Sequence, residues 1–204
     1  MKKLLLIAMA ILAICLFMGC ENNKAETENI PTKPSNMTEG DELSDIIVVY
    51  FSATNNTRTA AQYIAKELHC GLYEIVPTQK YTKEDLDWQA ENSRVNKEHE
   101  NPNILPEMQR MVPELSVYKT LIIGYPIWYG EAPSIMRSFL KNAAPIPDGL
   151  TVIPFCTSHS SPMGNSAKNL FKDVKNINLQ EGKRFELEPS QEEVVEWVKS
   201  LNLK

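Results

Sequence analysis

The segment IIVVYFSATNNTRTAAQYIAKELH, residues 46–69, changes character twice along its length. Residues 46–51 form an unbroken apolar and mostly β-branched run, which is typical of a strand that is covered on both faces. Residues 57–69 repeat apolar side chains three and four positions apart, the spacing of a helix with one buried side. The polar residues between these two runs therefore form a turn that leads from a buried strand into a helix.

The same alternation continues along the rest of the chain. Further strands are expected at residues 72–76, 120–124, 150–155 and 183–187, and further helices at residues 105–115, 132–142, 167–174 and 191–201. Strands that alternate with helices predict an α/β fold in which a parallel sheet carries helices on both faces. Ligands of such sheets bind outside the carboxyl ends of the strands, so the loops that follow each strand are the candidate site.

The first of these loops is rich in hydroxyl and amide side chains. It contains Ser52, Thr54, Asn55, Asn56 and Thr57, and neither lysine nor arginine. Backbone N–H groups at a helix N-terminus, together with hydroxyl groups, form an anion site. Because no Walker lysine is present, the loop favours one phosphate monoester over a nucleoside triphosphate. The alternative is that these side chains merely cap the helix.

Two later loops fall at the same edge of the expected sheet. The loop after the third strand contains Pro126, Ile127, Trp128, Tyr129 and Gly130. The loop after the fourth strand contains Thr157, Ser158, His159 and Gly164. The two aromatic side chains of the first of these loops offer a surface for a planar ligand, or else they pack against the rest of the domain.

These motifs, in this order, resemble the flavodoxin family. YFSATNNT is similar to the family's FMN-phosphate loop, S/T-x-T-G-N-T, and GYPIWYGEAPSIMRSFL is similar to the loop whose tryptophan stacks on the isoalloxazine ring. The resemblance implies a three-layer sandwich with a five-stranded parallel sheet of order 2-1-3-4-5, the order that is known for flavodoxin itself. It also implies FMN as the cofactor, bound by the residues named above in the three loops.

Two residues depart from the family pattern and leave several functions open. Asn55 replaces the motif glycine, and His159 stands where small members tend to have glycine. The first function is electron transfer to a partner protein or a quinone, in which the flavin does the chemistry. The second is an NAD(P)H-dependent FMN or quinone reductase. The third is a flavin-free module that binds a ligand or a partner, so enzyme activity stays open and no residue is assigned as catalytic.

The first 44 residues predict an exported and membrane-anchored protein. Residues 1–19 combine Lys2 and Lys3 with an apolar run, the layout of an export signal. Gly19-Cys20 follows that run and resembles the bacterial lipoprotein signal, in which the cysteine is lipidated. Residues 20–44 are polar and predict a flexible tether, which leaves residues 45–204 for the flavodoxin-like domain.

Composition excludes other classes of function. The formal net charge of -5 disfavours nucleic acid, whose phosphates require a basic surface. The three histidines do not have the spacing of metal ligands, and Ser158-His159 lacks the G-x-S-x-G context of a hydrolase. Cys70 and Cys156 are expected to stay unpaired and buried, and the alternating charges of residues 84–100 predict a solvated surface.

The anchor gives a first prediction. Cys20→Ser removes the thiol that would carry the lipid, so the protein should be released from the membrane fraction or remain unprocessed. Cell fractionation and intact-mass measurement check this. A mass that differs from that of the wild type only by the substitution itself, together with an unchanged membrane fraction, would show that Cys20 carries no lipid.

Overall fold

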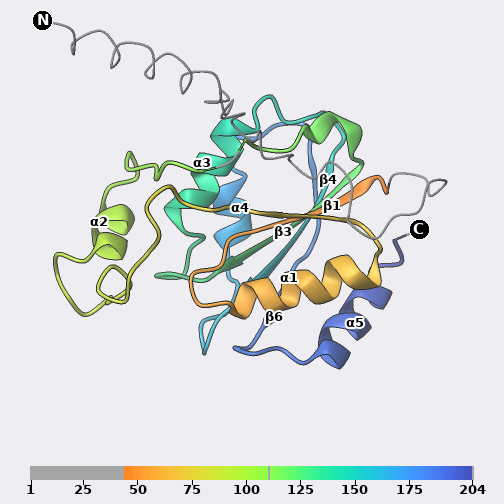
Figure 1. Cartoon of the computed structure of the whole chain (residues 1–204). Coiled ribbons are helices and arrows are strands. Elements are labelled where there is room, and N and C mark those ends of the chain that lie inside the picture. The colour runs from red at the N-terminus through yellow and green to blue at the C-terminus, as the bar shows by residue number, and fades with distance from the viewer. Residues whose placement is uncertain (1–43, 110, 204) are drawn as a thin grey trace, which may run out of the picture. The chain divides into compact units, whose positions relative to one another are not determined.

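The computed structural model describes residues 44–109 and 111–203, and a parallel sheet forms its centre. Figure 1 shows the sheet nearly edge-on between helices. The strands lie in the order β2 (Gly71–Glu74), β1 (Ile46–Tyr50), β3 (Thr120–Pro126), β4 (Thr151–Thr157) and β5 (Asn178–Leu179). Each neighbouring pair is parallel. The expected order 2-1-3-4-5 is therefore confirmed.

The last position of the sheet is shared by two short strands. β5 pairs with the start of β4, whereas β6 (Lys183–Phe185) pairs with its end. Pro154 lies between these contacts and has no N–H to donate, so the ladder is interrupted there. A side chain at Gly182 would place its Cβ 2.4 Å from the Pro154 carbonyl oxygen, which shows how closely the two backbones approach.

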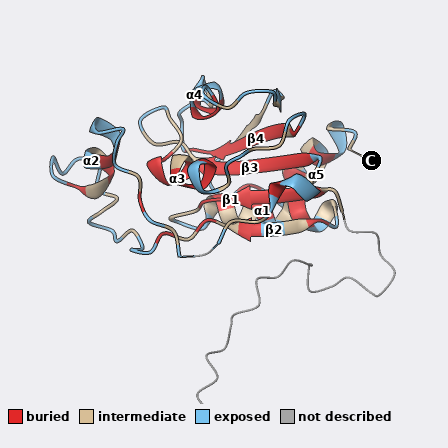
Figure 2. Ribbon diagram, turned by 90° about the horizontal axis from the view of Figure 1, so that it is seen from above, coloured by how far each residue is buried: buried red, intermediate tan, exposed pale blue. Residues whose placement is uncertain are grey.

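Helices cover both faces of the sheet, as the alternation predicts. α1 (Asn56–Glu67) and α5 (Gln191–Ser200) pack on the face that carries Val48 and Tyr50. α3 (Ser134–Asn142) and α4 (Ser166–Leu170) pack on the face that carries Val49. Figure 2, which looks onto the sheet, shows that β1, β3 and β4 are buried along nearly their whole length. Consecutive strand residues thus enter opposite cores, which explains the unbroken apolar run of β1.

The connection from β2 to β3 differs from the expectation. It contains the short helix α2 (Arg94–Glu100) and the 3₁₀ helix η1 (Leu115–Val117), but no helix over residues 105–109 or 111–114. The helix predicted for 105–115 is therefore wrong. Instead, Gln109 N–H donates to the Val76 carbonyl and Thr78 N–H to the Glu107 carbonyl, both at 2.8 Å, so this segment pairs with residues 76–78. Pro106 and Pro113 disfavour a helix there.

The N-terminal predictions fall outside the described residues. These are the signal at residues 1–19, the lipidation site Cys20 and the tether at 20–44 except for Ser44. Within the described ranges, no helix is both long and apolar enough to cross a membrane. Cys70 and Cys156 are both buried and unpaired, as the sequence predicts.

Gly124 in β3 gives a second prediction. A Cβ at Gly124 would lie 2.0 Å from the buried Phe155 ring, so Gly124→Ala overpacks the core. We expect the variant to lower the free energy of unfolding by about 1–3 kcal/mol, measured by urea denaturation. Gly71→Ala in β2 is the control, because the nearest atom to its added Cβ is 3.7 Å away. Equal losses in the two variants would contradict the overpacking.

Candidate functional site

Three loops meet at the carboxyl ends of β1, β3 and β4, and Thr157 joins them. The Thr157 hydroxyl lies 2.8 Å from the Thr57 hydroxyl at the start of α1, and both residues are buried. The Thr157 carbonyl accepts a hydrogen bond from Ile127 N–H at 3.0 Å. The structure thus brings together the three loops in which the sequence placed its candidate residues.

The β1–α1 loop leaves the N-terminus of α1 without a side-chain cap. Asn55 is the N-cap residue with φ 71°, a left-handed conformation that asparagine tolerates better than most side chains. Its side chain makes no capping hydrogen bond. By contrast, Ser190 caps α5 by accepting from Glu193 N–H at 3.1 Å. The first N–H groups of α1 therefore keep their capacity to bind an anion, supported by the helix dipole.

Other side chains of this loop are arranged around the helix start. Ser52 is half-buried and Thr54 is exposed. Asn56 donates to the Thr54 hydroxyl at 3.2 Å, and its side-chain oxygen accepts from Glu188 N–H at 3.3 Å. Hydroxyl and amide donors thus surround the uncapped end of α1, while the Thr57 hydroxyl is already bonded to Thr157.

A cation also lies beside this loop, which the sequence reasoning did not include. Arg58 follows the loop in the first turn of α1 and donates to the side-chain oxygen of Asn55 and to Glu74. Its charge is therefore paired within the fold. Burial, with the Glu74 charge as a second cause, raises the pKa of the adjacent Tyr50 to about 12. Tyr50 is thus a neutral phenol at physiological pH.

The β3–α3 loop turns tightly at its aromatic residues. Trp128 N–H donates to the Glu131 carbonyl at 3.0 Å, and Glu131 N–H donates back to the Trp128 carbonyl at 2.9 Å. Tyr129 and Gly130 between them have φ values of 53° and 78°, the pattern of a type I′ turn. This turn fixes Trp128 at the end of β3, next to Pro126 and Ile127.

Trp128 packs against two other aromatic rings. Its ring centroid lies 5.6 Å from that of Phe51 and 5.2 Å from that of Tyr81, with interplanar angles of 89° and 76°. Tyr81 comes from the β2–β3 connection, and no motif in the sequence pointed to it. Among the described residues, no aromatic ring stacks in parallel on the Trp128 indole.

A buried ion pair holds Tyr81 in place. Glu98 of α2 is only 4% exposed; it accepts from the Tyr81 hydroxyl at 2.6 Å and pairs with Arg94 at 2.6 Å. The Arg94 guanidinium lies over the Tyr81 ring, 3.9 Å from its centroid. Burial, together with the Glu98 hydrogen bond, raises the pKa of Tyr81 well above its usual value. The prediction of a solvated surface for residues 84–100 is thus wrong at Glu98, because its partner Tyr81, 17 residues earlier in the chain, lies outside the helix pattern.

α2 also contacts the aromatic turn directly. The exposed Tyr129 ring stacks on His99 with centroids 4.3 Å apart, and its hydroxyl donates to Asn96. Ser134 at the start of α3 donates to the Glu98 carbonyl at 3.0 Å. Tyr129 therefore contacts α2 and secures this helix to the turn that follows β3.

The β4–α4 loop is held by a second arginine that the sequence reasoning missed. Arg184 of β6 donates to the Ser158 hydroxyl at 2.9 Å and to the carbonyls of Ser158 and His159 at 3.1 and 3.0 Å. His159 is exposed, and Gly164 has φ 52°. The Ser158 hydroxyl also donates to the Ser161 carbonyl, so Ser158 and His159 do not form a nucleophile and base.

Cys156, near the end of β4, is the cysteine that lies beside these loops, and it is buried. Burial raises the pKa of the Cys156 thiol to about 12, so it is not a reactive thiolate. The described residues contain no cluster of potential metal ligands.

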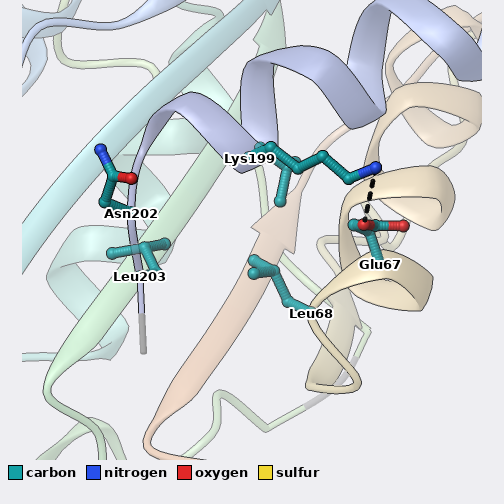
Figure 3. Close-up of a pocket in the computed structure, with 6 residues that line it drawn as sticks. Glu67, Leu68, Lys199, Asn202 and Leu203 are labelled. Atoms are coloured by element: carbon teal, nitrogen blue, oxygen red, sulfur yellow. Dashed lines mark ion pairs between the residues drawn. The ribbon is translucent and has the colours of Figure 1, made fainter.

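A hollow lies between the C-terminal ends of α1 and α5, at the opposite end of α1 from the three loops (Figure 3). It is lined by Glu67, Leu68 and Lys199 among others, and Glu67 and Lys199 form an ion pair there.

Comparisons with known proteins identify relatives of the chain. A flavodoxin family model matches residues 45–201. Provisionally named flavoproteins of Bacteroides uniformis and Bacteroides eggerthii are 36% and 35% identical, with TM-scores of 0.71 and 0.70. Each comparison covers 78% of this chain, and 99% and 98% of those chains. A Lactobacillus acidophilus flavoprotein in complex with FMN shares the fold at 18% identity, with a TM-score of 0.56 over 68% of this chain and 91% of its own. No curated protein matches the sequence.

The hydrogen bond between the Thr57 and Thr157 hydroxyl groups gives a third prediction. Thr57→Val or Thr157→Val leaves the partner hydroxyl buried without this hydrogen bond, at a cost of about 1–3 kcal/mol in the free energy of unfolding. Replacing both removes both hydroxyls, so the double variant should lose less than the sum of the two single variants. Urea denaturation of all four proteins measures the coupling. Strictly additive losses would show that the hydroxyls do not stabilise each other.

Proposed function

The chain belongs to the flavodoxin family, and we propose that it binds FMN between its three loops and transfers electrons to a partner protein or a quinone. The observation that carries this proposal is the uncapped N-terminus of α1 beside the Trp128 turn. One end of the site suits a phosphate and the other a planar ring. The FMN complex of the Lactobacillus acidophilus flavoprotein supports the choice of cofactor.

The phosphate end fits one anionic group. The N–H groups of the first turn of α1 would bind it, with Ser52, Thr54 and Asn56 as further donors. Asn55 already has the left-handed conformation for which the family motif uses glycine, so this substitution does not exclude FMN. Asn55 and His159 are the two sequence features that favour a flavin-free module, and Asn55 therefore no longer supports it.

The ring end depends on Trp128. Phe51 and Tyr81 hold the indole at near right angles, which orients it without a parallel ring upon it. Such an indole is suited to stack on an isoalloxazine ring. FMN, when bound, supplies the capacity to accept and donate electrons, and the protein supplies its position and electrostatic surroundings. The net charge of -5 disfavours further negative charge on the bound cofactor.

We further propose that this domain works at a membrane after export. The signal-like residues 1–19, Cys20 and the polar residues 20–44 support this placement. A reductase that oxidises NAD(P)H is the second candidate, because such an enzyme needs a second binding surface beside the flavin. Tyr81 and α2, which belong to the β2–β3 connection, lie beside the ring end and would supply that surface. An NAD(P)H oxidation assay in the presence of FMN separates it from a carrier.

The two ends of the site give a fourth prediction. Thr54→Ala should weaken FMN binding by about 1.5–3 kcal/mol, because a hydrogen bond to a charged group is lost, and should leave riboflavin binding unchanged. Trp128→Ala should weaken the binding of both by about 1–3 kcal/mol, through lost stacking. Fluorescence titration measures each affinity.

Wild-type protein is the reference for both variants. It should bind FMN more tightly than riboflavin, which has the same ring and no phosphate. Equal affinities for the two flavins would refute the phosphate site. Equal affinities of wild type and Trp128→Ala would show that the indole only packs against Phe51 and Tyr81.

A further inference from the structure

Asn55 places a side chain where the family motif has none. It lies at the junction of the β1–α1 loop and α1, directly before the N–H groups that would bind the phosphate. Asparagine is among the best residues for capping a helix N-terminus, because its side-chain oxygen accepts those same N–H groups. An unrestrained Asn55 amide would therefore compete with a phosphate for its donors.

In the structure, the side-chain oxygen of Asn55 is engaged elsewhere. It accepts a hydrogen bond from one terminal nitrogen of Arg58, three residues further along the chain. The other terminal nitrogen of Arg58 binds the Glu74 carboxylate at the end of β2. The planar guanidinium thus bridges Asn55 and the sheet, a geometry that the single amine of lysine does not offer.

The surroundings of Arg58 stabilise this bridge. The side chains of Arg58 and Glu74 are 36% and 24% exposed, so the pair is partly shielded from water. Tyr50, which is buried, lies beside both of them and interacts with each. The hydrogen bond to Glu74 is the main cause that raises the pKa of Arg58, with Tyr50 contributing, so the guanidinium keeps its charge.

We propose that Arg58, anchored by Glu74, is a positioning residue that holds the Asn55 amide away from the N-terminus of α1 and so keeps the phosphate donors available. This inference rests on the proposed FMN site. It explains how an asparagine can occupy the glycine position of the loop. It differs from direct attraction between Arg58 and the phosphate, since Glu74 already compensates the charge of Arg58.

The test compares FMN and riboflavin affinities of five proteins by fluorescence titration. They are wild type, Arg58→Met, Asn55→Gly, the double variant Asn55→Gly/Arg58→Met, and Lys66→Met. Lys66→Met is the matched control, because it removes one positive charge from the same helix at an exposed position away from Asn55. The riboflavin affinity reports whether each variant still folds and still binds the isoalloxazine ring.

We expect Arg58→Met to lower FMN affinity about tenfold, the size of one hydrogen bond, with riboflavin affinity unchanged. Asn55→Gly should bind FMN at least as tightly as wild type, because no amide needs to be held. The double variant should match Asn55→Gly within about twofold, since the loss in Arg58→Met acts through Asn55. Lys66→Met should match wild type.

Three results would overturn the inference while leaving the FMN site intact. The first is an unchanged FMN affinity in Arg58→Met. The second is an equal loss of FMN affinity in the single and double variants, which would mean that Arg58 acts on the phosphate by its charge. The third is an equal loss of FMN and riboflavin affinity in Arg58→Met, which would indicate a general structural role. If wild type and Asn55→Gly both fail to prefer FMN over riboflavin, the proposed function fails and this inference fails with it.

Discussion

Strand β1 is paired on both edges and buried over its whole length, and the candidate site is built outward from it. Its neighbours β2 and β3 must run parallel to it, so their carboxyl ends reach the same edge. The residue that follows it, Phe51, contacts the Trp128 and Tyr81 rings, and the next loop leads directly into α1. The position of a single central strand thus determines which loops can approach one another.

The sequence predicted those parts of the fold that depend on local patterns. The apolar runs located β1, β3 and β4, and helical spacing located α1, α3 and α5. β5 was missed because two residues are too few to show any pattern. Arg58, Tyr81 and Arg184 were missed because their roles depend on partners far along the chain, such as Glu74 for Arg58 and Ser158 for Arg184. Charge and hydroxyl content indicated an anion loop, but they could not reveal where a neighbouring guanidinium points.

The β2–β3 connection shows why a polar segment can still belong to the interior. Its carboxylate Glu98 is removed from water, a change that is costly unless hydrogen bonds replace those to the solvent. Arg94 and Tyr81 supply them, and α2 is thereby tied to a fixed place beside Trp128. Removing one partner of such a group costs more than the pair contributes, because a buried charge remains. The wall beside the ring end is therefore specified by polar contacts as well as by the packing of Tyr81 on Phe51 and Trp128.

The break at Pro154 has a consequence for contacts between molecules. An exposed sheet edge can recruit a strand from another chain, and proteins limit this with short or interrupted edges. One edge of this sheet is β2, with four residues, and the other is divided into β5 and β6, with two and three. Each offers fewer consecutive positions than a typical strand of about five or six residues. Crowded copies of this domain would find little backbone on which to start intermolecular β-pairing, even though neither outer position of the sheet pairs with a further strand of the described residues.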